Sequence, residues 1–142
     1  TLFPYTTLFR SAVKVLSSSV EKGNTEANIY LAKAYRAAGD EEKANEILNN
    51  FANSEEVSSE TYQVMADILA EQANYSMALE AINQGLSMEK VPNKKQLMKN
   101  KIGIMECMGD FAGALNAANE YLTEYPADTD VIREAIFLNT RV

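Results

Sequence analysis

The side chains with the clearest chemical potential in this sequence are adjacent carboxylates. Glu41-Glu42 and Glu55-Glu56 are two such pairs, and we interpret them as helix-start and solubilising charges rather than as an acid–base pair. The chain has no histidine, so the most common general base is missing. It also lacks the spacing of a phosphate-binding loop, a nucleophile elbow or a zinc site. The sequence therefore predicts no enzyme activity, no catalytic residue, no metal and no cofactor.

The single cysteine, Cys107, lies between Glu106 and Met108. A reactive thiol needs a basic neighbour or a helix N-terminus to lower its pKa, and neither is visible nearby. We therefore expect a passive, partly buried cysteine. One cysteine also rules out a disulfide within this chain.

A lysine cluster and a set of methionines occupy the second half of the chain. The lysines could meet acidic residues of a partner, but we favour a solvated, basic loop and helix start. Lysines at a helix N-terminus oppose the helix dipole, and the sequence offers no reason for them. The methionines recur at helical spacing, which predicts core packing rather than an adaptable binding surface. The cluster comprises Lys90, Lys94, Lys95, Lys99 and Lys101; the methionines are Met65, Met77, Met88, Met98, Met105 and Met108.

Composition and charge restrict the partners. The chain has 142 residues, of which 46% are hydrophobic, and a net charge of −7. An acidic chain repels phosphate backbones, so we expect a protein or peptide partner and no nucleic acid. No run of 18 apolar residues occurs, which predicts no membrane insertion by this segment. The oligomeric state stays open, and so does the compartment. The protein would be cytoplasmic or, if a lipoprotein signal has been lost from the sequence, located in a bacterial cell envelope.

Residues 1–11 differ in composition from the rest, with two Phe, one Tyr, three Thr and one Pro. This stretch resembles the in-frame translation of a sequencing adapter. We therefore predict a non-native N-terminal segment and a native sequence that starts near Ala12, inside a helix. The alternative is a native extended arm.

Internal repetition is the strongest pattern in the chain. Leu31-Ala32-x-x-Tyr35 recurs 34 residues later as Met65-Ala66-x-x-Leu69. A third copy runs from Gly109-Asp110 to Pro126. Apolar residues at helical spacing alternate with good N-cap residues, so the sequence predicts an all-α fold. The predicted helix starts are Asn24/Thr25, Asp40, Ser58, Asn74, Asn93, Asp110 and Asp128.

These features resemble the tetratricopeptide repeat, a helix–turn–helix unit of 34 residues. The resemblance implies an α-α superhelix, a right-handed solenoid formed by residues 12–142. Its parts would be a half repeat over 12–22, repeats near 25–58, 59–94 and 95–128, and a terminal helix over 129–140. That helix is expected to cap the array with Ile132, Ala135 and Ile136 inward. Lys101-Ile102 followed by Gly103 departs from the pattern and predicts that a helix crossing shifts by one residue.

In this family the first helix of each repeat lines a concave groove. The resemblance places these residues in the groove as partner contacts: Glu26, Ile29, Tyr30, Lys33, Arg36, Gln63, Val64, Asp67, Ala70, Glu71, Gln96, Lys99, Asn100, Gly103 and Glu106. Some family members bind chaperone tails with a clamp of Lys, Asn and Arg residues, and this clamp is absent here. Ile29 and Lys33 stand in place of its Lys and Asn in the first repeat, and Val64 stands in place of its Asn in the second. Gln96 and Asn100 stand in place of its Lys and Arg in the third.

The favoured function is therefore a scaffold or adaptor that presents a groove to a protein or peptide. The alternative is an architectural or regulatory repeat region of a larger enzyme, transcriptional regulator or envelope lipoprotein. A bare architectural spacer without a groove ligand also stays open. The degenerate repeats, rich in Asn and Glu, suggest a bacterial source.

Overall fold

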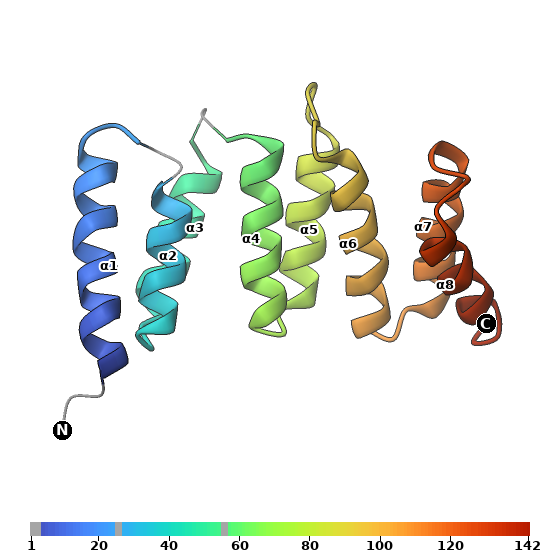
Figure 1. The fold of residues 1–142 in the computed structure, drawn as a ribbon, viewed down its shortest axis with the longest axis horizontal. Coiled ribbons are helices and arrows are strands. Elements are labelled where there is room, and N and C mark those ends of the chain that lie inside the picture. Colours follow the sequence, from blue (N-terminus) through green and yellow to red (C-terminus); the bar gives the residue numbers. More distant parts are fainter. Residues whose placement is uncertain (1–3, 25–26, 55–56) are drawn as a thin grey trace. The chain divides into compact units, whose positions relative to one another are not determined.

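In the computed structural model, which describes residues 4–24, 27–54 and 57–142, every regular element is an α-helix (Figure 1). The predicted all-α fold is therefore confirmed over these residues. The chain divides into two compact units, Thr1–Val57 and Ser58–Val142. The first unit holds α1 Pro4–Glu21, α2 Ala27–Ala37 and α3 Glu41–Ala52. The second holds α4 Ser59–Glu71, α5 Tyr75–Leu86, α6 Lys94–Cys107, α7 Phe111–Glu124 and α8 Thr129–Asn139.

Helix starts follow the cap residues expected from the sequence. The side chains of Asp40, Ser58, Asp110 and Asp128 each accept a hydrogen bond from a backbone nitrogen in the first turn of their helix. These bonds satisfy donors that have no partner within the helix. Asn74 and Asn93 also precede their helices, but neither makes such a bond. Thr25, part of the first predicted start, lies outside the described residues.

The turns within the helical hairpins share one backbone conformation. Gly39, Ala73 and Gly109 occupy corresponding positions and have φ angles of 89°, 55° and 77°. Glycine adopts this left-handed region freely, whereas Ala73 adopts it at a steric cost. The turn at Ala73 therefore has the same backbone geometry as the two glycine turns with which the repeat alignment paired it.

In the first unit, α2 packs against both α1 and α3. Ala32 and Ala44 are fully buried where helices meet, and Leu48 and Phe51 fill the adjoining space. Helix α1 runs through residues 4–11, so the alternative of an extended N-terminal arm is wrong. The foreign origin of residues 1–11 stays a prediction.

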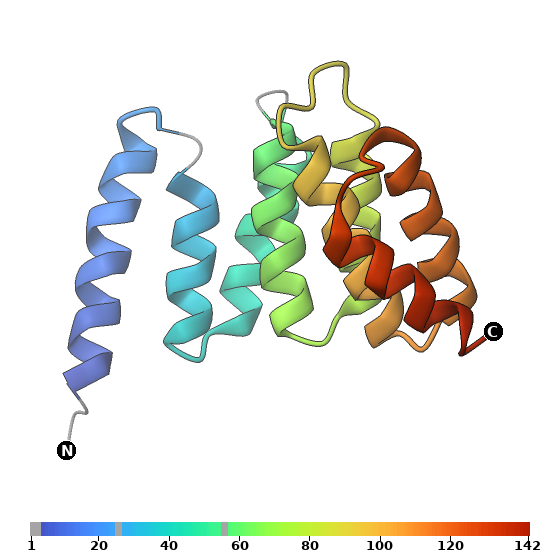
Figure 2. The same cartoon turned by 45° about the vertical axis from the view of Figure 1, so that its right-hand side comes forward.

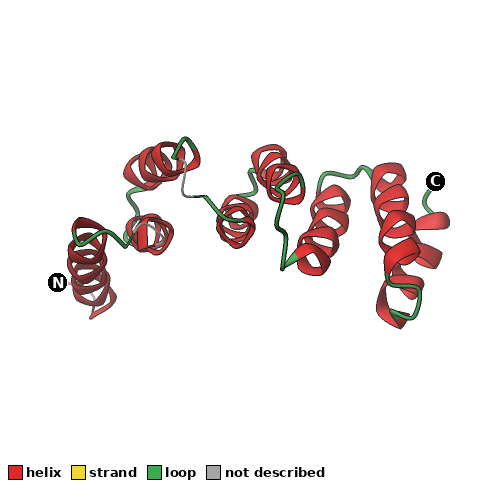
Figure 3. Cartoon of the chain, turned by 90° about the horizontal axis from the view of Figure 1, so that it is seen from above, coloured by secondary structure: helices red, strands yellow, loops and turns green. Residues whose placement is uncertain are grey.

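In the second unit, each helix packs against the next along the chain, and α4 also contacts α6. Seen from above, α4 and α6 lie on the same side of α5 (Figure 3). The core contains the fully buried side chains Ile68, Ile82, Leu97, Tyr121 and Leu138. Met65 is buried, and Met98 and Met105 pack against the core, as the helical spacing predicted. Met77 and Met108 are instead 44% and 43% exposed, so the prediction of core packing is wrong for these two.

The close helix approach in the second unit occurs at Gly85. A Cβ atom on Gly85 would lie 3.0 Å from Tyr62 Cβ and 3.1 Å from Leu97 Cδ1, so α5 fits closely against its neighbours there. A Cβ on Gly103 would meet nothing within 4 Å, and Ile102 is buried in the core. The predicted one-residue shift of the crossing at Gly103 is therefore wrong, because Ile102 occupies the core position and Gly103 faces outward.

Helix α8 crosses α7 (Figure 2). The face of α8 that packs against α7 differs from the one expected. Val131 and Leu138 are buried against α7, with Ala135 half-buried beside them. Ile132 and Ile136 are instead 36% and 64% exposed, so their predicted inward placement is wrong. Val131, Ala135 and Leu138 have helical spacing i, i+4 and i+7, which gives an equally apolar stripe rotated by one residue.

Candidate functional site

The most extensive set of polar contacts between helices in the second unit joins α4 to α6. The Asn93 side-chain nitrogen donates to Gln63 Oε1 at 2.7 Å and to the Ser59 carbonyl oxygen at 3.1 Å. The Ser59 hydroxyl donates back to Asn93 Oδ1 at 2.6 Å. Asn93 precedes the first residue of α6, yet its side chain bridges two helices instead of capping its own.

The same contact continues about two turns further along α6. Asn100 Nδ2 donates to Asp67 Oδ1 at 3.1 Å, and Gln96 Nε2 donates to Asn100 Oδ1 at 2.8 Å. Gln96 and Asp67 are exposed. We call this surface the α4–α6 polar face and define it as Gln63, Asp67, Asn93, Gln96 and Asn100. It presents carboxamide and carboxylate groups, which can both donate and accept hydrogen bonds.

Lysines of α6 bind the turn between α7 and α8. Lys99 Nζ lies 2.9 Å from Asp128 Oδ2, and Lys94 Nζ lies 2.7 Å from Glu124 Oε1. Lys95 Nζ lies 5.4 Å from the centroid of the Tyr125 ring. The expectation of a merely solvated lysine cluster is therefore wrong for Lys94 and Lys99, whereas Lys95 is exposed as expected. Their partners on the adjacent turn explain lysines at a helix start, where the dipole alone disfavours them.

Asp128 is the centre of this contact. It accepts a hydrogen bond from the Tyr121 hydroxyl at 2.6 Å in addition to the Lys99 ion pair. Lys99 first, and then Tyr121, hold the pKa of the Asp128 carboxyl well below its ordinary value. The hydrogen bond to Asp128 raises the pKa of Lys99. Lys99, predicted to contact a partner, is thus engaged within the chain.

The pKa of one carboxyl group of α6 is raised. Glu106, near the end of α6, and Glu134 of α8 are both half-buried. Burial first, and then interaction with the carboxyl group of Glu134, raise the pKa of Glu106 to about 7. Glu106 was predicted to lie in the groove, whereas the sequence did not indicate Glu134.

In the first unit, the candidate residues of α2 fall into two groups. Tyr30 is 55% exposed and Lys33 is also exposed, while Arg36 is half-buried. Ile29 is only 3% exposed, so its predicted role as a surface contact is wrong. The hydrophobic stripe of α2 includes it. Glu26 lies outside the described residues.

The remaining predicted positions are on α4 and α6. Val64 and Ala70 are half-buried, and Glu71 and Gly103 are exposed. Cys107 is exposed, which corrects the expectation of a partly buried thiol, because it lies in the last turn of α6 away from the core. Glu55-Glu56 lies outside the described residues, while Glu41-Glu42 occupies the first turn of α3 as expected.

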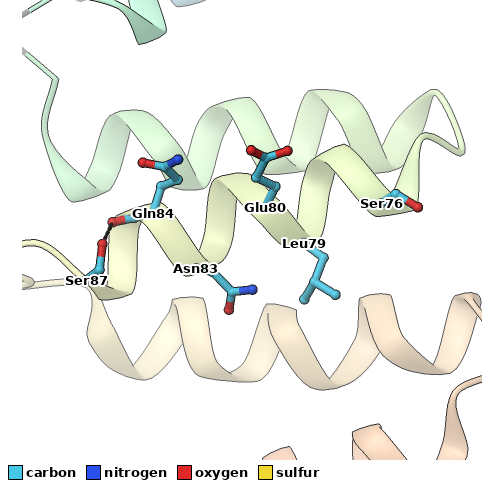
Figure 4. Close-up of a pocket in the computed structure, with 6 residues that line it drawn as sticks. All are labelled: Ser76, Leu79, Glu80, Asn83, Gln84 and Ser87. Carbon is cyan, nitrogen blue, oxygen red and sulfur yellow. Dashed lines mark hydrogen bonds between the residues drawn. The ribbon is translucent and has the colours of Figure 1, made fainter.

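A second surface, on α5, is shallow and polar. A hollow there is lined by Ser76, Leu79, Glu80, Asn83, Gln84 and Ser87, all from α5 or the residue after it (Figure 4). The Ser87 hydroxyl donates to the Gln84 carbonyl oxygen at 2.8 Å, and the hollow contains one ionisable side chain, Glu80. Because it lies on another helix of the same unit, this hollow is a suitable control surface for experiments on the α4–α6 polar face.

The spacing of these polar contacts is close to the length of one repeat. Ser59 and Asn93 are 34 residues apart, and Asp67 and Asn100 are 33 apart. The corresponding turns at Ala73 and Gly109 are 36 apart (109 − 73), so the bonded residues lie two to three residues from equivalent positions of the two repeats. The sequence indicated Asn93 as a helix start, and repeat spacing alone did not pair it with Ser59.

Two further searches cover only the described part of the chain. Within it, no three His, Cys, Asp or Glu side chains come close enough together to hold a metal ion. None of its helices combines the length and apolarity that a membrane span requires.

No family model matches the sequence, and no curated protein matches it either. A solved structure of PilF from Pseudomonas aeruginosa, described as a functional characterisation of that protein, is similar with a TM-score of 0.63. The similarity covers 96% of this chain and 69% of that chain at 16% sequence identity. The fold is tetratricopeptide-like. At this identity the likeness concerns the arrangement of helical hairpins alone.

Proposed function

We propose that this chain is a protein-interaction scaffold that holds a protein or peptide partner on the α4–α6 polar face. The observation that carries the proposal is the set of hydrogen-bonding groups joining the first helices of two successive hairpins, of which Asp67 and Gln96 are exposed. Apolar residues of the same helices enter the core, so the polar residues on this face are not required for burial. A backbone or polar side chain of a partner would find both donors and acceptors here.

The first unit extends the proposal to α2. Tyr30 and Lys33 are exposed on the helix that corresponds to α4 and α6 in the repeat pattern. An exposed tyrosine beside a lysine supplies an amphipathic anchor and a charge, which are frequent at protein interfaces. We propose that these two residues contribute partner contacts, and that Ile29 does not.

A second candidate is an architectural role, as a spacer or as a regulatory region of a larger enzyme, transcriptional regulator or envelope lipoprotein. The observation that favours it is that the polar face already satisfies many of its own groups. Asn93 and Asn100 are both bonded to side chains of α4. Such bonds stabilise helix stacking without any ligand.

Quantitative affinity enrichment from the source organism separates the two roles. The bait is the full chain, and the test variant is Gln96→Lys, which places a bulky cation on the polar face. We expect at least one partner to be recovered about tenfold less, because one misplaced charge at an interface costs on the order of 1–2 kcal/mol.

Gln84→Lys is the matched control, since Gln84 is also exposed, makes the same charge change and lies on α5. Recovery of every partner should be unchanged by this control. Equal recovery with both variants would favour the architectural role, and a loss confined to Gln84→Lys would move the binding surface to α5.

A further inference from the structure

Helix α8 has an apolar stripe that its packing against α7 leaves uncovered. Val131 and Leu138 are buried on the α7 side, whereas Ile132 and Ile136 are 36% and 64% exposed. These two isoleucines are four residues apart, so they lie one above the other on one face of the helix. Single exposed apolar residues are ordinary, but two branched side chains on adjacent turns form a continuous hydrophobic strip.

This strip carries no unbalanced charge along its length. Thr129 and Asn139 extend it by one turn at either end, and both are exposed. Glu134 lies midway between the two isoleucines in the sequence, but a helical step of about 100° per residue places it on the opposite side of α8. Arg133 flanks the strip, and its charge is balanced by Asp130, which lies 3.7 Å away.

The spacing of the strip is the same in either direction along the helix. We call it the α8 stripe and define it as Thr129, Ile132, Ile136 and Asn139, which are separated by three, four and three residues. If a second copy of α8 lies antiparallel across the stripe, Ile132 of each copy meets Ile136 of the other, and Thr129 meets Asn139. Each contact then occurs twice, as a twofold axis requires. The hydroxyl and carboxamide groups can hydrogen-bond to each other, and the two helix dipoles oppose one another.

The charge of the chain favours a second copy at this place. With a net charge of −7, two copies repel each other, and their contact is least unfavourable where charge is absent. We propose that the α8 stripe is a self-association surface at which two copies of this chain pair through antiparallel α8 helices. Phe137, also exposed on α8, lies outside the stripe, and Arg141 Cζ is 5.0 Å from the centroid of its ring.

Pairing through α8 alone is weak. From Thr129 to Asn139 the stripe extends about 15 Å along the helix. It is too small to bury the roughly 800 Å² per partner of a standard interface, so we expect a dissociation constant on the order of 10–100 µM. Because the two copies repel through their net charge, added salt should strengthen the dimer.

Sedimentation equilibrium of the full chain, over a wide range of concentrations around that value, tests the proposal. The expected result is a reversible monomer–dimer equilibrium. Ile136→Glu should weaken dimerisation by about tenfold or more, because each copy then places a carboxylate in the stripe. Met77→Glu makes the same charge change at an exposed apolar residue of α5 and should leave association unchanged. Circular dichroism should show an unaltered helix content in both variants, since both side chains are exposed.

Disulfide trapping determines the direction of the paired helices. In a Cys107→Ser background, which removes the exposed native thiol, chains with Ile132→Cys are mixed with chains with Ile136→Cys. Antiparallel pairing should give mainly the mixed disulfide, because each of these positions faces the other across the twofold axis. Disulfides formed chiefly between identical chains overturn the proposal, and so does an Ile136→Glu chain that associates like wild type. A chain that stays monomeric at every concentration, as it would if a different protein covers the stripe, also overturns it.

Discussion

Asp128 begins α8, and its carboxylate has three kinds of partner. It accepts hydrogen bonds from the first turn of its own helix, pairs with Lys99 of α6 and accepts from the Tyr121 hydroxyl of α7. A single side chain therefore joins three helices. At this scale the sequence predicted the cap correctly, because capping depends on residue type and local position. The partners from α6 and α7 depend on packing between helices, which one position does not reveal.

Replacing Tyr121 by Phe tests this contact with little change of shape. Tyr121 is fully buried, and its hydroxyl donates to a charged acceptor, so we expect a loss of about 1–2 kcal/mol in the free energy of unfolding. Because the pKa of Asp128 is lowered, its stabilisation is present above the ordinary value of 3.8 and lost as the pH falls below it.

Urea denaturation at pH 7 measures the loss from Tyr121→Phe, and the same series at decreasing pH measures its acid dependence. The variant should differ from wild type less at pH 2 than at pH 7. A constant difference across that range would mean that the hydroxyl acts on something other than ionised Asp128.

Helix α5 lies close to its neighbours at Gly85, while Gly103 on α6 has open space around it. These two glycines show that the same residue type plays different roles within one packed unit. At Gly85 the missing side chain permits close packing of α5. At Gly103 it only lowers helix propensity.

Alanine at each position gives opposite expected results. Gly85→Ala forces a methyl group to within 3.0 Å of Tyr62 Cβ. Overpacking of this kind typically costs about 1–3 kcal/mol of stability. The higher helix propensity of alanine offsets roughly 1 kcal/mol of that loss. Gly103→Ala meets no neighbour within 4 Å and should stabilise by about 0.5–1 kcal/mol. Thermal denaturation of both variants checks the pair. Equal effects at the two sites would contradict the packing assigned to Gly85.

Helix positions were more predictable than helix orientation. Asp40, Ser58, Asp110 and Asp128 mark helix starts by residue type, and the structure confirms them. The inward face of α8 was mispredicted because the helix has two neighbouring apolar stripes. One contains Ile132 and Ile136, and the other contains Val131 and Leu138. Sequence period alone does not choose between stripes one residue apart, whereas contact with Tyr121 and the rest of the α7 core does.

The candidate site was predictable only in part for a related reason. Family resemblance indicated Gln63, Asp67, Gln96 and Asn100, but not that they bond to one another or to Asn93. It also placed the buried Ile29 on the surface. The effect of Glu134 on the pKa of Glu106 was not predicted, because the two residues are 28 apart, which is not one repeat.

For the whole molecule, two compact units each carry exposed polar residues on the first helix of a hairpin. Among the described residues, the second unit also contains the largest fully buried side chains. Buried residues of α4 and α6 in this core, such as Ile68 and Leu97, position the α4–α6 polar face.

Site-specific photo-crosslinking tests the central claim most directly. A photoreactive amino acid is placed at Gln96 in the full-length protein within its source cells, and at Gln84 on α5 as the control. Gln96 should yield a discrete covalent adduct with a protein partner, identified by mass spectrometry, and Gln84 should not. No adduct from Gln96, or the same adducts from both positions, would contradict partner binding on the α4–α6 polar face.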